Sequence, residues 1–282
     1  MHVLPHDNRL AGTSTSRPGH GHGEAGAASG RGGASRRIAR RAGGLLLAAL
    51  LSACAHHNPL ARWAPSPNFD TRRPVLIVLH YTAGRSVESS LHTLQTANSE
   101  GPVSAHYLLA RDGTLLQLVD EDRRAWHAGE GHWGTISDVN SASIGIEIDN
   151  DGHSPYPDAQ IEQLIVLLGD LTRRLGIPRR QVIGHEDMAP GRKIDPGPLF
   201  PWQRLHEAGF GLWPDPAAGA PPPGFDGWLA MAALGYPLDD RAAALQSFRH
   251  HFRGLQDDGG PLDAEDLRIL HALTWQLSGQ AP

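Results

Sequence analysis

The segment 74–82 constrains the fold more than any other part of this chain, because residues 75–79 are all apolar and mostly β-branched. Such a run is typical of a strand that is buried on both faces, as in a sheet covered by helices. His80 closes this run, so we expect its side chain at the rim of the sheet. His185 follows a shorter apolar run at 181–184 in the same way.

Asp195 lies shortly after His185, and with His80 the three side chains offer two imidazoles and one carboxylate. Three nitrogen and oxygen ligands are the number that a catalytic zinc uses when its fourth position holds water. The chain has a single cysteine, so no thiolate set is available for a closed structural site. The three residues together therefore predict a metal hydrolase site, although each of the 17 histidines taken alone could be structural.

Two further residues suit the chemistry of such a site. Glu147 lies in the alternating run 143–150, whose three isoleucines share one face while Glu147 projects from the other. It is either an exposed strand charge or a general base. Lys193 is the only lysine in the chain, and its compact ammonium can stabilise an oxyanion without the geometric demands of a guanidinium.

Five short motifs give the chain a family resemblance: LHYTA at 79–83, SAHYL at 104–108, AWHAG at 125–129, SIGIE at 143–147 and DPGPLFPW at 195–202. With these motifs in the family's order over residues 73–215, the chain resembles the zinc-dependent N-acetylmuramoyl-L-alanine amidases of the amidase-2 family, most closely their lipoprotein members. The resemblance implies that one zinc ion is bound by His80, His185 and Asp195. It also implies that Glu147 is the catalytic acid and base and that Lys193 stabilises the transition state.

The activity implied is hydrolysis of the amide between N-acetylmuramic acid, or its anhydro form, and the L-alanine of the peptidoglycan stem peptide, in cell-wall turnover or remodelling. Trp126, His127 and Trp133 are expected to line the groove for sugar or peptide, or else to be structural. Two alternatives remain open: a non-catalytic peptidoglycan-recognition protein of the same fold, and a zinc peptidase that cleaves within the stem peptide. The intact set of metal and catalytic residues favours the amidase.

Strands and helices alternate along residues 74–213, which predicts an α/β amidase domain with a mixed central β-sheet flanked by helices. Helices are expected near 86–97 and from 158 to 176, the second capped by Asp158, with a hairpin at 106–119. The proline-rich segment 214–223 predicts a linker. Beyond it, helices near 225–235, 239–253 and 264–277 resemble a small peptidoglycan-binding domain, which we place at 224–282.

The single cysteine, Cys54, follows arginines at 36–41 and an apolar run at 43–53 that is short for a membrane span. The run LSAC at 51–54 resembles a bacterial lipobox, so we expect a signal peptide at 36–53, acylation of Cys54 and a tether at 54–73. A short membrane anchor or an ordinary secretory signal are the alternatives. Residues 1–35 lack hydrophobic periodicity and are expected to be a disordered extension that precedes the true start.

Partners and location follow from the same features. The residue after Cys54 is not aspartate, which by resemblance to Gram-negative lipoproteins favours the periplasmic face of the outer membrane. A net charge of −5 gives no reason to expect nucleic acid as a partner. We expect a monomer that acts on peptidoglycan or its muropeptides.

Overall fold

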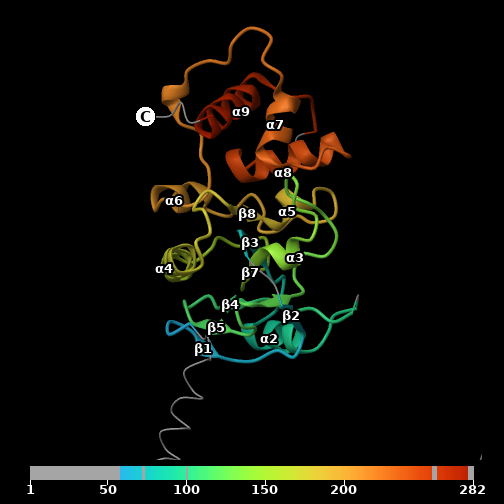
Figure 1. The fold of residues 1–282 in the computed structure, drawn as a ribbon, viewed down its shortest axis with the longest axis vertical. Coiled ribbons are helices and arrows are strands. Elements are labelled where there is room, and N and C mark those ends of the chain that lie inside the picture. The colour runs from blue at the N-terminus through green and yellow to red at the C-terminus, as the bar shows by residue number, and fades with distance from the viewer. Residues whose placement is uncertain (1–57, 72–73, 100, 256–258, 279–282) are drawn as a thin grey trace, which may run out of the picture. The chain divides into compact units, whose positions relative to one another are not determined.

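The computed structural model describes residues 58–71, 74–99, 101–255 and 259–278. The expected extension, signal peptide and Cys54 lie outside these residues. Within them, a six-stranded sheet has the order β1-β5-β4-β7-β3-β8, and β2 pairs with β6 in a second, two-stranded sheet (Figure 1). The strands are β1 (Arg62–Trp63), β2 (Phe69–Thr71), β3 (Leu76–Tyr81), β4 (Tyr107–Leu109), β5 (Leu115–Gln117), β6 (Arg123–Ala125), β7 (Ser143–Ile148) and β8 (Val182–Gly184).

Strand β3 lies between β7 and β8 and is parallel to both. Its residues 76–79 have no exposed surface, as the apolar run predicted. Strand β4 is parallel to β7 but antiparallel to β5, so the sheet is mixed. The predicted α/β fold with a mixed central sheet is therefore confirmed.

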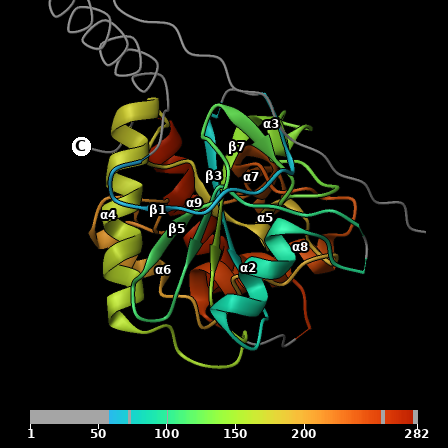
Figure 2. The same ribbon diagram turned by 90° about the horizontal axis from the view of Figure 1, so that it is seen from below.

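Helices cover both faces of this sheet (Figure 2). The helices are α2 (Val87–Gln95), α3 (Val139–Ala142), α4 (Asp158–Leu175), α5 (His185–Met188), α6 (Trp202–Glu207), the 3-10 helix η2 (Pro216–Ala218), α7 (Gly227–Leu234), α8 (Arg241–Arg253) and α9 (Ala264–Leu277). On one face, Ile77 and Leu79 of β3 share a core with α4 and α6. On the other, Leu76 and Val78 share a core with α7, α8 and α9. A third core joins Leu94 of α2 to strands β4 and β5.

The ends of the two predicted helices are set by different caps. Ser86 caps α2, and its side chain and that of Ser89 form a reciprocal capping box. Helix α4 begins at Asp158 itself, so the expectation that Asp158 is the N-cap is wrong by one residue. Its carboxylate pairs with Arg204 and lies at the positive end of the helix dipole instead. Gly176 ends α4 in the left-handed conformation, at φ 69°, as predicted.

The described part of the expected tether is folded against the sheet. Arg62 and Trp63 form β1, which pairs with β5, while residues 69–71 pair with β6. The buried Asn58 donates from its backbone to Gln117 and from its side chain to Asp170. No local pattern in residues 58–71 predicted this pairing, because the partner strands lie far along the chain.

The three C-terminal helices α7, α8 and α9 form close to the predicted positions. The predicted linker before them contains only the short 3-10 helix η2 among its described residues. The three helices are not separated from the sheet, since α8 packs against α5 and α6, and Phe248 is fully buried in the core that contains Leu76 and Val78. Among the described residues, no helix is long and apolar enough to cross a bilayer.

Candidate active site

One cavity of about 400 Å³ contains all five residues that were predicted to carry metal binding and catalysis: His80, Glu147, His185, Lys193 and Asp195. It lies on the face of the sheet from which His80 projects, between α2 on one side and the segment 192–195 on the other. The residues come from three strands or strand ends and one loop. The tertiary structure therefore joins positions that are far apart in the sequence.

The register of the central strands explains this convergence. His80 of β3 is paired with Glu147 of the parallel strand β7, so the two side chains leave the same face of the sheet. Leu79 is paired with Gly184 at the end of β8, which places His185 beside His80. Ligand sites at the carboxyl ends of parallel strands are common for this geometric reason.

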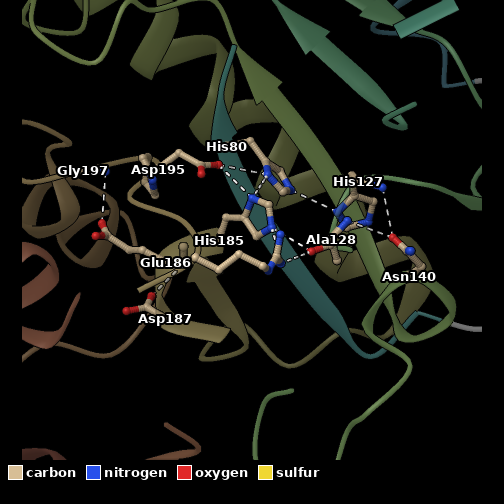
Figure 3. Close-up of polar contacts among 12 residues, drawn as sticks. His80, His127, Ala128, Asn140, His185, Glu186, Asp187, Asp195 and Gly197 are labelled. Carbon is tan, nitrogen blue, oxygen red and sulfur yellow. Dashed lines mark hydrogen bonds and ion pairs between the residues drawn. The ribbon is translucent and has the colours of Figure 1, made fainter. Parts of the chain in front are cut away.

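His80, His185 and Asp195 are buried and direct one atom each to a common point (Figure 3). Nδ1 of His80 lies 2.9 Å from Nδ1 of His185. Oδ2 of Asp195 lies 3.1 Å from the first nitrogen and 3.0 Å from the second. The set contains two imidazole nitrogens and one carboxylate oxygen, as the sequence predicted.

A relay of hydrogen bonds determines the tautomer of His80. Ser143 Oγ donates its only hydrogen to the carbonyl of Val139, at 2.6 Å, so it must accept from Nε2 of His127, at 3.2 Å. A neutral His127 then has a lone pair on Nδ1, which accepts from Nε2 of His80 at 3.0 Å. Nδ1 of His80 is therefore left without a proton, and it faces Nδ1 of His185 and Oδ2 of Asp195.

His185 has the same tautomer for a different reason. Its Nε2 lies 2.8 Å from the carbonyl oxygen of Ala128, and only a protonated nitrogen can bond to that acceptor. The carbonyl is held in place because Asn140 Oδ1 accepts from the backbone nitrogens of His127 and Ala128, and because Arg192 also donates to it. Nδ1 of His185 is therefore also a lone-pair donor.

This donor set fits a zinc ion. Two nitrogen lone pairs and a carboxylate that face one another at about 3 Å repel unless a cation lies between them. A tetrahedral zinc with ligand distances of about 2.0–2.2 Å would separate its ligand atoms by roughly 3.3–3.6 Å, a few tenths of an ångström more than the spacing here. In both histidines the remote ring nitrogen donates to a second residue, which is the usual arrangement around a metal-bound imidazole.

The ionisation of the ligands also suits a cation. Burial, followed by the electrostatic interaction with the neighbouring His185, lowers the pKa of His80 to about 4, so its imidazole is neutral near pH 7. Burial alone would raise the pKa of Asp195, but its electrostatic interactions and hydrogen bonds with His185 and His80 hold the pKa of this carboxyl below its usual range. Asp195 is therefore the anionic member of the set.

Glu147 projects into the same cavity, as its alternation with the isoleucines predicted. Its Oε2 is buried and has no hydrogen-bond partner among the residues that the structure describes. Burial, reinforced by the negative charge of Asp195, raises the pKa of Glu147 well above the usual range, and the positive charge of Lys193 opposes this rise. A carboxyl group with a raised pKa in a cleft is suited to accept and return a proton.

Of the three predicted substrate residues, the structure places two at the cavity. Trp126 and His127 line it, and His127 is also bonded to His80. Trp133 does not line this cavity. The residue is 9% exposed, and its ring packs edge-on against Tyr236, in the core that the sheet shares with the C-terminal helices. The structure thus assigns Trp133 to the core rather than to the groove.

Several residues that support the site were missed by the sequence reasoning. Ser143 and Asn140 had no signal of their own, because their partners are separated from them by tertiary structure. Gly145 did have a local signal, because a glycine inside a strand often marks a place where another group packs closely against the backbone. A Cβ at Gly145 would lie 2.3 Å from Cγ of His127, so only glycine lets this ring pack against β7.

Comparison with known proteins gives one matching family and several relatives. The amidase-2 family, described as N-acetylmuramoyl-L-alanine amidase, matches residues 70–198. The N-acetylmuramoyl-L-alanine amidase AmiD of Escherichia coli is 35% identical over 266 residues, which cover 80% of this chain and 94% of AmiD.

Solved structures agree in fold. A complex of E. coli AmiD with anhydro-N-acetylmuramic acid-L-Ala-D-gamma-Glu-L-Lys superposes with a TM-score of 0.63 at 37% identity, covering 74% of this chain and 92% of AmiD. AmpDh3 of Pseudomonas aeruginosa in complex with anhydromuramic pentapeptide gives a TM-score of 0.64 at 34% identity, covering 78% of this chain and 98% of AmpDh3.

Proposed function

Because the chain belongs to the amidase-2 family of N-acetylmuramoyl-L-alanine amidases, we propose that its cavity hydrolyses the amide between N-acetylmuramic acid and L-alanine with a zinc-activated water. The observation that carries this proposal is the presence of Glu147 and Lys193 in the same cavity as the buried set His80, His185 and Asp195. A recognition protein that only binds peptidoglycan has no need of a buried glutamate and a lysine beside a complete ligand set.

Zinc bound by the three ligands would lower the pKa of a coordinated water towards neutrality and polarise the scissile carbonyl. The protein residues supply the proton transfers and part of the charge stabilisation. Glu147 accepts the proton of the attacking water and passes it to the departing amine of L-alanine. The ammonium of Lys193 faces the carbonyl oxygen as negative charge develops on it, an interaction that is strongest in the transition state.

The substrate class follows from the relatives. AmiD and AmpDh3 were both solved with anhydromuramyl peptides, so we propose that muropeptides of this kind are substrates here as well. The indole of Trp126 lines the cavity and offers an apolar surface to the sugar or to the stem peptide. Residues of α2, including Ser89 and Thr93, line the same cavity; their hydroxyl hydrogens are donated within the helix, but their hydroxyl oxygens can accept hydrogen bonds.

Digestion of a soluble anhydromuropeptide and of purified sacculi by the zinc-loaded protein tests the proposal. We expect a new free amine on L-alanine and release of intact stem peptide, detected by mass spectrometry. A new amine on a later residue would instead indicate a stem-peptide peptidase. Binding to sacculi without any new amine would indicate a recognition protein, and either result would refute the proposed chemistry.

For the cellular location, we propose that the protein is anchored by acyl chains on Cys54 at the periplasmic face of the outer membrane. Support comes from the LSAC run at 51–54 and from the basic and apolar segments before it. A single acyl chain gives only marginal membrane binding, so stable attachment requires the several chains of a bacterial lipoprotein.

A further inference from the structure

Two buried carboxylates follow His185 directly, and each contacts a histidine of α8. Nδ1 of His250 lies 2.7 Å from Oε2 of Glu186, and Nδ1 of His251 lies 2.8 Å from Oδ2 of Asp187. Glu186 is 1% exposed and Asp187 has no exposed surface. A buried carboxyl group without a hydrogen-bond partner is costly, so these contacts fix where the two side chains lie.

Glu186 connects the two segments that carry the metal ligands His185 and Asp195. Its backbone nitrogen donates to the carbonyl oxygen of Asp195 at 2.9 Å. Its Oε1 accepts from the backbone nitrogen of Gly197 at 3.1 Å, while Oε2 is the atom that contacts His250. A rotation of the Glu186 side chain would therefore disturb the loop just after Asp195 (Figure 3).

Asp187 acts on the other side of His185. Its Oδ2 accepts from the backbone nitrogen of Gly184 at 2.7 Å as well as from His251, and this bond holds the start of α5. Its Oδ1 accepts from the hydroxyl of Tyr236, which follows α7, at 2.6 Å. All three donors bond to one carboxylate, so two of the C-terminal helices help to fix the turn on which His185 lies.

The histidines of α8 are themselves held firmly. The ring of His251 stacks on that of Trp202, with 3.7 Å between ring centroids and 11° between ring planes. Both histidines are 5% exposed. Helix α8 thus presents the Nδ1 atoms of two buried imidazole rings to the metal-binding segment 184–197.

We propose that His250 and His251 are positioning residues for the metal site, acting through Glu186 and Asp187. This inference rests on the proposed function, since it assumes that His185 and Asp195 bind zinc. It means that the C-terminal helices complete the metal site, in addition to any role in binding peptidoglycan. The sequence had suggested instead a separate peptidoglycan-binding domain at 224–282, joined by a linker at 214–223.

The test compares zinc affinity in full-length variants. His250→Ala and His251→Ala remove the nitrogen groups, whereas His250→Asn and His251→Asn retain a side-chain nitrogen near the position of Nδ1. The matched control is Ile269→Ala in α9, which creates a cavity in the C-terminal core and makes no polar contact with 184–197 among the described residues. Zinc affinity is measured by competition with a chromophoric chelator, and folding by circular dichroism and thermal unfolding of the zinc-free proteins.

We expect both alanine variants to bind zinc about 10-fold more weakly than the wild type, at the low end of the range for direct partners of a metal ligand, because these histidines act through Glu186 and Asp187. The asparagine variants should recover most of this affinity. Ile269→Ala should unfold at a lower temperature but bind zinc as the wild type does. If an alanine variant fails to fold, His250→Leu and His251→Leu, which fill the space but carry no hydrogen-bond donor, should show the same weakening.

Wild-type zinc affinity in folded alanine or leucine variants would overturn the inference, because the histidines would then only hold the helices together. An equal loss of affinity in Ile269→Ala would overturn it as well. Failure of the wild-type protein to bind zinc would refute the proposed function instead, so the two failures can be told apart.

Discussion

His80 and Glu147 are direct neighbours across the parallel strands β3 and β7, and both side chains enter the same cavity. One belongs to the metal-ligand set and the other is a buried carboxyl group with a raised pKa. The spacing between the adjacent strands β3 and β7 therefore sets the distance between the metal ligand His80 and the carboxyl group of Glu147.

His80→Ala and Asp195→Ala should each abolish stable zinc binding, because two remaining ligands are too few for a tight site. Metal analysis of the purified, folded variants provides the measurement, with the exposed His153→Ala as the control. Treatment of the wild type with a chelator should remove activity, and added zinc should restore it. Full zinc occupancy in either folded variant would remove that residue from the proposed ligand set.

Glu147→Gln and Lys193→Met should each lower turnover by roughly two to four orders of magnitude while zinc remains bound, since this is the range for general acid–base and oxyanion groups. Steady-state kinetics on a soluble muropeptide, together with metal analysis, measures both properties. Glu207→Gln, on the surface of α6, is the matched control and should retain wild-type turnover. A variant of Glu147 with near wild-type turnover would exclude this residue as the proton acceptor.

The acidic limb of the pH profile should depend on Lys193. Glu147 must lose its proton to act as a base, so kcat/KM rises as the pH increases through its pKa. Burial raises this pKa and the positive charge of Lys193 lowers it. Lys193→Met should therefore move the acidic limb to higher pH, in addition to lowering the maximum value of kcat/KM. A limb that stays in place or moves to lower pH would contradict the proposed coupling between the two residues.

His127 should contribute to zinc affinity through the tautomer of His80. His127→Phe keeps a ring against Gly145 but removes the Nδ1 acceptor, so Nδ1 of His80 is no longer kept free of its proton. We expect zinc binding to weaken about 10- to 100-fold. The exposed His92→Phe in α2 serves as the control. Unchanged zinc affinity with weakened substrate binding would show that His127 is a substrate residue only.

If Cys54 is lipidated, the mature protein should begin at this residue and carry acyl chains. Mass spectrometry of the N-terminal peptide from the membrane fraction measures this directly. Cys54→Ser should release the protein from the membrane. An unmodified Cys54 within a longer mature chain, or a membrane-bound Cys54→Ser protein, would rule out the proposed anchor.

The sequence by itself was sufficient for the elements and residues that depend on local patterns. An apolar run predicted β3, alternation predicted that Glu147 leaves β7 on the face opposite its isoleucines, and Gly176 predicted the end of α4. The five metal and catalytic residues were also singled out from the sequence, through strand ends, a single lysine and the resemblance to a known family. These signals are local, since side-chain direction in a strand and the caps of a helix depend on a few neighbouring residues.

Only the tertiary structure determined how distant segments support the site. Residues 58–71 looked like a tether because their strand partners are remote, and Trp133 looked like a groove residue because nothing local reveals its packing against Tyr236. The contacts of His250 with Glu186 and of His251 with Asp187 each join positions 64 residues apart. Buried polar groups are satisfied by whichever donors the fold brings to them, and that choice depends on packing rather than on any pattern along the chain.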